Sequence, residues 1–281
     1  IPAEASVVHN PLPRNRYALM IGVAVGAVIV VAILMFARVI RADNLADIVI
    51  LVSLAATIAY FVVILSSRKV TALERSRVVA FIPLFIVSVG FWSLYQQQFT
   101  VMTVYSDKRL NRDLFGWEMP VSWVNSINPI FIIVLSGVFA AIWTKLGSRQ
   151  PSTPVKFGLA AIVMGAAFLL FLPFAGGGEN STPLLAIVGI LFVFTVAELL
   201  LSPVGLSVTT KLAPEAFHTQ MVALFFLSVS LGTAISGQLA TLYNPDDEVP
   251  YFSSLGLIAI AVGVVLLLFA KPVLKLMRGV R

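Results

Sequence analysis

The chain has 281 residues, of which 59% are hydrophobic and 11% charged, with a formal net charge of +6 and no cysteine. These proportions lie outside the range of water-soluble globular domains and predict an integral membrane protein. The absence of cysteine excludes disulfides, thiolate metal sites and cysteine nucleophiles. The basic residues form no face interleaved with aromatic side chains, which argues against nucleic-acid binding.

Apolar stretches of membrane-spanning length recur along the whole chain. A helix needs roughly 20 apolar residues to cross a hydrocarbon core about 30 Å thick, and the alternating pattern of a β-barrel is missing. We therefore expect an all-α protein with eight spans, over residues 18–38, 45–66, 78–104, 121–144, 157–175, 183–210, 219–243 and 251–270. The proline-bearing segment 1–17 predicts a cytoplasmic linker, and because the chain opens with Ile-Pro, we expect it to be a piece of a larger protein.

The placement of Lys and Arg predicts the orientation of these spans. If both ends of the chain face one side, fourteen of the nineteen basic residues lie on that side and five on the other. Cytoplasmic loops carry the excess of Lys and Arg in membrane proteins. Both ends of the chain are therefore predicted to be cytoplasmic.

The first two spans carry few polar side chains and predict a lipid-facing or scaffolding pair. The third span differs, because it contains Trp92 and three consecutive amides, Gln96, Gln97 and Gln98. Amides within the hydrocarbon need hydrogen-bond partners. These residues therefore either hold helices together or face a polar cavity.

The fourth span opens with Asn128 directly before Pro129. A proline inside a helix frees a backbone carbonyl and removes a donor. Irregular backbone at this depth is tolerated only where protein or a cavity satisfies it. We therefore expect a disturbed helix here, near polar groups of other spans.

The sixth span contains Glu198, an acidic residue within a long apolar stretch, where an ionisable group costs on the order of 3 kcal/mol. Ser202 follows one helical turn later on the same face, just before Pro203, where the backbone can bend or open. The seventh span adds the aromatic pair Phe225 and Phe226. We expect no buried Lys or Arg in spans three to eight, so the partner of Glu198 must be a polar side chain, a ligand or a group elsewhere in the protein, unless its carboxyl is protonated. The spans contain no arrangement typical of an enzyme or a metal site.

Three strings in these spans resemble the seventh, eighth and tenth helices of the proton-dependent oligopeptide transporter family, within the major facilitator superfamily. They are FWSLYQQ at 91–97, WVNSINPIF at 123–131 and ELLLSPVGLSVTTKLAP at 198–214. The resemblance implies a major-facilitator-type six-helix C-terminal bundle over 78–281, preceded by an inter-bundle transmembrane pair over 18–77. It also implies an N-terminal six-helix bundle outside this chain.

The same resemblance implies a function and a set of site residues. The function is a symporter that imports di- and tripeptides with protons across the bacterial inner membrane by alternating access, without a cofactor. Glu198 would receive the peptide ammonium group and is also the candidate for proton coupling. The remaining peptide-binding residues would be Asn128, Ser202, Trp92, Gln97, Phe225 and Phe226.

Two positions depart from the family pattern. Many relatives have an acid where this chain has Gln96, which cannot titrate, and the usual tryptophan of the eleventh helix is replaced by Phe225. Two alternatives therefore stay open. One is a transporter of the same family for another small solute, such as an amino acid, nitrate or a drug, and the other is a membrane scaffold without transport activity.

Overall fold

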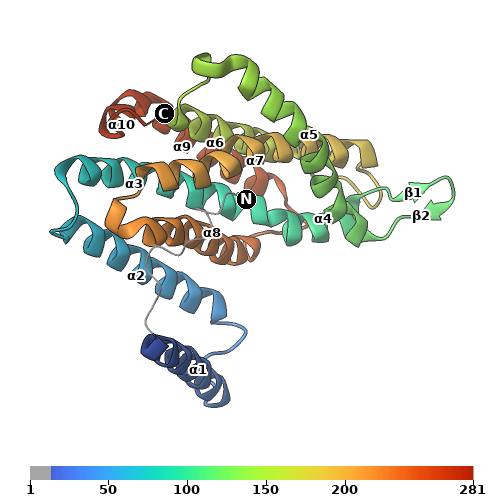
Figure 1. Ribbon diagram of the computed structural model, residues 1–281. Helices are drawn as coiled ribbons and strands as arrows, with labels where there is room; N and C mark the ends of the chain where they lie inside the picture. The colour runs from blue at the N-terminus through green and yellow to red at the C-terminus, as the bar shows by residue number, and fades with distance from the viewer. Residues whose placement is uncertain (1–13, 281) are drawn as a thin grey trace. The chain divides into compact units, whose positions relative to one another are not determined.

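The computed structural model describes residues 14–280, which are almost wholly helical (Figure 1). Within the described residues, eight helices are long and apolar enough to cross a membrane. They are Arg16–Phe36, Leu45–Ser66, Ala72–Arg109, Val121–Arg149, Thr153–Phe174, Leu184–Leu212, Glu215–Ala240 and Val249–Leu268. The predicted all-α class and the number and order of the spans are confirmed.

The contacts of the chain divide it into two compact units, residues 1–48 and 49–281. The first unit contains α1 (Arg14–Phe36) and the beginning of α2 (Leu45–Ser66). Residues 1–13 of the predicted linker lie outside the described residues, and its last four residues belong to α1. The domain limits at residues 17 and 77 stay predictions.

The third span begins at a capping box and is interrupted near its end. Thr71 Oγ1 accepts a hydrogen bond from the Glu74 N–H at 3.3 Å, and Glu74 Oε2 accepts one from the Thr71 N–H at 2.8 Å, which satisfies two donors at the helix end. α3 (Ala72–Tyr95) passes into a 3-10 turn, η2 (Gln96–Phe99), and then into α4 (Val101–Arg109). The turn forms because Thr100 leaves the helical region, at φ −117° and ψ −90°, and donates its hydroxyl to Gln97 Oε1 at 2.9 Å.

Three helices have an internal proline, and none of them is interrupted there; α3 contains Pro83. α5 (Val124–Leu146) passes through Pro129, and α7 (Leu184–Leu212) passes through Pro203. A transmembrane helix can lose one backbone bond where neighbouring helices satisfy the freed group, so both helices continue past these residues. The expected disturbance of the helix at Pro129 and bend at Pro203 stay predictions. Among the described spans, the third is interrupted at η2, inside the segment Ala72–Arg109.

Short elements join the spans. β1 (Asp113–Leu114) and β2 (Trp117–Glu118) form a hairpin whose two turn residues, Phe115 and Gly116, both have positive φ, as a tight two-residue hairpin turn requires. The remaining elements are η3 (Val121–Trp123), η4 (Gly147–Arg149), α6 (Thr153–Leu169), η5 (Leu172–Phe174), η6 (Glu215–Phe217), α8 (His218–Ala240), α9 (Val249–Leu268) and α10 (Ala270–Leu276). The hairpin gave no signal in the hydropathy pattern, because its strands are only two residues long.

Helices α6 and α9 cross at glycines. A Cβ atom on Gly165 would stand 2.5 Å from the Gly256 carbonyl oxygen, and one on Gly263 would stand 2.6 Å from the Gly158 carbonyl oxygen. Small residues let transmembrane backbones approach closely enough for packing to hold them together. These four glycines therefore fix the spacing of the two helices.

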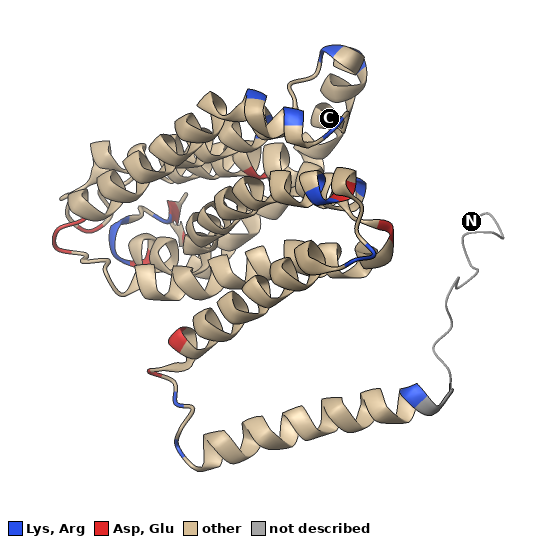
Figure 2. Cartoon of the chain, turned by 90° about the vertical axis from the view of Figure 1, so that its left-hand side faces the viewer, with Lys and Arg blue, Asp and Glu red and all other residues tan. Residues whose placement is uncertain are grey.

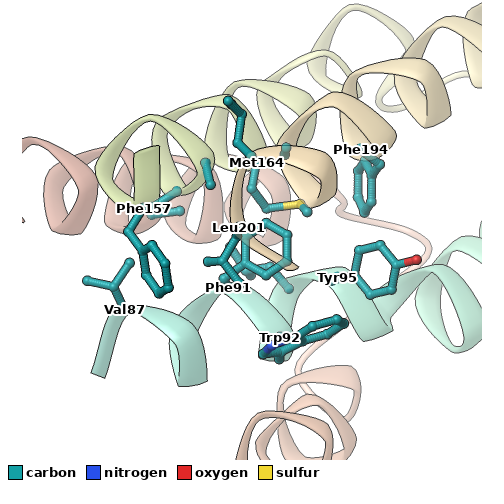
Figure 3. Packing of buried hydrophobic residues seen from close by; sticks show 14 of the residues in the cluster. Val87, Phe91, Trp92, Tyr95, Phe157, Met164, Phe194 and Leu201 are labelled. Atoms are coloured by element: carbon teal, nitrogen blue, oxygen red, sulfur yellow. The ribbon is translucent and has the colours of Figure 1, made fainter. Parts of the chain in front are cut away.

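In the second unit, α7 packs against α3, α5, α6 and α8. Figure 2 shows Lys, Arg, Asp and Glu gathered mainly toward the ends of the helices, with the central turns mostly uncharged. The aromatic and aliphatic side chains of Figure 3, among them Phe91, Met164, Phe194 and Leu201, fill the interior where α3, α6 and α7 meet. This packing brings the polar positions of α3, α5 and α7 together.

Candidate functional site

Glu198 lies in the middle of α7, one turn before Ser202. Its side chain is half-buried, and its Oε2 atom is buried without a hydrogen-bond partner among the described residues. The polar side chains beside it are Tyr95 of α3 and Asn128 of α5. Within residues 14–280, no Lys or Arg forms an ion pair with it.

Asn128 belongs to a buried hydrogen-bond chain that joins three helices. The Tyr95 hydroxyl donates to Asn128 Oδ1 at 2.9 Å, and Asn128 Nδ2 donates to Thr195 Oγ1 at 2.9 Å. Thr195, in turn, donates its hydroxyl to the Leu191 carbonyl at 2.9 Å. Sequence reasoning missed Tyr95 and Thr195 as site residues. The available signal was their spacing, since each lies three residues from a predicted site residue, Trp92 or Glu198, and so shares its helical face.

Trp92 lies next to Tyr95 on α3, as Figure 3 shows. The centres of the two rings are 5.2 Å apart with edge-to-face geometry, and only 8% of Trp92 is exposed. Its Nε1 is buried without an acceptor among the residues described. Its Cβ packs so closely on Gly232 of α8 that a Cβ at that glycine would stand 2.7 Å away. Trp92 is therefore near the Glu198 group but is also part of the α3–α8 contact.

The three glutamines occupy different environments in η2. Gln96 Nε2 donates to Thr233 Oγ1 at 2.9 Å, and Gln97 Nε2 donates to the Ser236 carbonyl at 3.1 Å. Both bonds reach α8, so these two amides hold helices together, as one of the two interpretations expected. Gln98, only 1% exposed, leaves both amide atoms without a partner among the described residues.

Phe225 and Phe226 of α8 differ in exposure. Phe225 is 5% exposed, and its ring packs on Gly205 of α7, where a Cβ would stand 2.7 Å from the ring. Phe226 is 57% exposed, with its ring centre 5.5 Å from that of Phe225. Ser202 is half-buried, one turn before the glycine. The structure thus places Phe225 behind the surface and Phe226 on it.

A buried ion pair lies near the ends of several helices, away from the predicted site. Arg109 Nε is 3.2 Å from Glu248 Oε1, and the Tyr243 hydroxyl donates to the same oxygen at 2.8 Å. Glu248 Oε2 also accepts from the Gly176 N–H at 3.4 Å. Burial, together with the hydrogen bond to Glu248, raises the pKa of the Tyr243 hydroxyl. Both charges looked like loop residues in the sequence, because neither lies inside an apolar run.

One expectation about charges is wrong. We expected no buried Lys or Arg in spans three to eight, but α6 begins at Thr153 rather than 157 and includes Lys156, which is 7% exposed. Its Nζ donates to Gln150 Oε1 at 2.8 Å and lies 4.1 Å from the centre of the Trp143 ring. An amide oxygen and an aromatic face thus compensate the buried ammonium group. In the part of the chain described here, no three acidic or histidine side chains cluster as metal ligands would.

Comparison with known proteins gives the family of this chain. The model of the POT family matches residues 10–258. A di-/tripeptide transporter of Lactococcus lactis subsp. cremoris is 42% identical over 245 residues, which cover 85% of this chain and 49% of that protein.

Two solved structures share the fold. A variant of the peptide transporter POT in complex with alafosfalin is 39% identical, with a TM-score of 0.86, over 98% of this chain and 56% of the other. A POT family transporter in complex with 5-aminolevulinic acid is 34% identical, with a TM-score of 0.80, over 94% of this chain and 56% of the other. The chain spans about half the length of these relatives. It is a multi-pass membrane protein of the expected major-facilitator-type fold, and the match to the family model shows that it belongs to the POT family.

Proposed function

We propose that the protein containing this chain is a proton-coupled symporter that imports di- and tripeptides across the bacterial inner membrane by alternating access. The observation that carries the proposal is Glu198, whose buried Oε2 has no partner within residues 14–280. In a medium of low dielectric constant, a carboxylate without a basic neighbour attracts a terminal ammonium group strongly. The relatives named as peptide transporters support the same substrate class.

The proposed peptide contacts follow the exposure of each side chain. Glu198 and Ser202, both half-buried, and the exposed Phe226 are open to direct contact with a peptide. Asn128 and Gln97 are each 2% exposed, so they act from behind this surface by holding neighbouring side chains. Trp92 and Phe225 form the packed aromatic wall of the site in the same proposal.

The other half of the site belongs, in this proposal, to an N-terminal six-helix bundle of the same protein. Peptide-binding sites of such transporters lie near the bilayer midplane between structural repeats. Both ends of the chain would be cytoplasmic, as the fourteen-to-five distribution of basic residues favours. Inward transport would be driven by protons, because each charge that crosses gains about 2.3 kcal/mol per 100 mV.

Uptake of radiolabelled dialanine by the full-length protein in proteoliposomes tests this function. With an acidic exterior, the wild-type protein should accumulate dialanine, and Glu198→Gln should abolish the driven uptake. Glu118→Gln is a matched control, because the side chain of Glu118 is 70% exposed in the hairpin between spans; it should transport normally. A wild-type protein that takes up no dialanine under these conditions would refute the proposal.

The same assay examines the two alternatives. Transport of another small solute is favoured by one observation, the solved relative in complex with 5-aminolevulinic acid. If 5-aminolevulinic acid were transported and dialanine neither transported nor able to compete with it, that alternative would replace the peptide. A membrane scaffold would tolerate Glu198→Gln without any change in uptake, because it would show none.

A further inference from the structure

The hydrogen-bond chain beside Glu198 has a fixed direction. Thr195 gives its only hydroxyl proton to the Leu191 carbonyl, so towards Asn128 it can only accept. Asn128 therefore turns Nδ2 to Thr195 and Oδ1 to Tyr95, and the single proton of Tyr95 goes to Oδ1. All three bonds measure 2.9 Å, and Thr195 and Asn128 are 0% and 2% exposed, so water does not compete for them.

This direction explains why Tyr95 gives no hydrogen bond to Glu198 Oε2 although it lies beside the carboxyl group. The Tyr95 proton is directed at Asn128, so the tyrosine presents a lone pair to the carboxyl group. A lone pair repels a carboxylate oxygen but accepts a hydrogen bond from a carboxylic acid. On the side of Tyr95, the arrangement therefore suits a protonated Glu198 that donates to the hydroxyl oxygen.

We propose that Tyr95, held by Asn128 and Thr195, is a positioning residue through which α3 and α5 respond to the protonation of Glu198. When Glu198 releases its proton to water, the Tyr95 hydroxyl turns its own proton to the carboxylate, and Asn128 Oδ1 loses its donor. Tyr95 keeps that proton throughout and only reorients it. A buried polar group left without its partner is unstable, so one proton at Glu198 changes the favoured arrangement of three helices. This inference rests on the proposed function, in which the ionised Glu198 receives the peptide ammonium group.

Among the titratable side chains of the helices that pack on α7, Tyr95 is the one placed to respond to the protonation of Glu198. The helices packed on α7 are α3, α5, α6 and α8. Their titratable side chains other than Tyr95 lie within two turns of a helix end: Glu74, Arg75, Arg77, Lys145, Lys156 and His218. Tyr95 is the one that interacts with Glu198 in the described part of the chain. The amides nearby, Gln98 among them, cannot titrate, nor can Gln96, which replaces the acid of many relatives.

Variants of the full-length protein separate coupling from binding. Tyr95→Phe removes the hydroxyl but keeps the ring that packs on Trp92, and Thr195→Val removes the acceptor of Asn128 while Thr195→Ser retains it. We expect Tyr95→Phe to lower proton-driven dialanine uptake at least about tenfold and Thr195→Val to lower it about three- to tenfold, the range for one hydrogen bond. Dialanine counterflow, which needs no net proton movement, should stay within about threefold of wild type. Thr195→Ser should restore driven uptake.

A second readout needs no substrate. Infrared difference spectra between acidic and alkaline pH should contain the carbonyl stretch of protonated Glu198, identified by its loss in Glu198→Gln. In Tyr95→Phe this band should move, because the carboxylic acid loses its hydrogen-bond acceptor. If the band does not move, or if driven uptake and counterflow fall in parallel in both Tyr95→Phe and Thr195→Val, the inference is wrong. If the wild-type protein transports no dialanine but the band moves in Tyr95→Phe, the proposed function is refuted and the hydrogen bond is supported.

Discussion

Replacing Glu248 by glutamine should destabilise the protein far more than breaking an ion pair on its surface. Glu248 has a side chain that is 0% exposed, and its partner Arg109 is 15% exposed. Removing one partner of a buried ion pair costs about 3–5 kcal/mol, because the other charge stays buried alone. Two features reduce this cost: Arg109 Nη2 keeps its bond to the Pro245 carbonyl at 2.7 Å, and the new amide oxygen can still accept from Tyr243. We therefore expect a loss of about 2–3 kcal/mol.

Thermal unfolding of the detergent-solubilised full-length protein measures this loss. At about 2–4 °C per kcal/mol for large domains, Glu248→Gln should lower Tm by about 4–12 °C. The control is Glu118→Gln, which breaks the Arg112–Glu118 pair. That pair is closer, at 2.7 Å, but Glu118 is 70% exposed, so its loss should cost under about 1 kcal/mol. Equal shifts of Tm in the two variants would refute this prediction. It assumes that the burial of an ion pair, rather than the distance between its charged atoms, determines the free energy lost when the pair is broken.

Three further substitutions test the packing of the bundle. Gly165→Ala should destabilise by about 1–3 kcal/mol in thermal unfolding, because its Cβ would overlap the Gly256 carbonyl, whereas Gly90→Ala, with no atom within 4 Å of the new Cβ, should be neutral or stabilising. Thr71→Ala removes the α3 capping box and should cost about 1 kcal/mol in the same assay, while Thr71→Ser should cost little. Gly205→Ala should push the Phe225 ring out of its place and raise the KM for peptide uptake several-fold more than it lowers the maximal rate; unchanged kinetics would show that this ring does not shape the site.

The candidate site was only partly visible in the sequence. Glu198 stood out because an acid inside an apolar run is costly, and Asn128 stood out because it precedes a proline within a span, while the resemblance supplied its role in peptide binding. For Tyr95 and Thr195 the only signal in the sequence was their spacing of three residues from Trp92 and Glu198, which is weak because many residues share a helical face. Their importance comes from hydrogen bonds that join α3, α5 and α7. The sequence of one helix does not indicate which other helices pack against it.

The membrane class, the eight spans and their order followed from the sequence alone, because the thickness of the hydrocarbon core sets the length of each apolar run. Tertiary structure decided where helices are interrupted and which polar groups meet. The third span is interrupted at Thr100, and Arg109 pairs with Glu248 across 139 residues of sequence. Such contacts depend on how the helices pack against one another, and the local composition of a span does not determine its neighbours.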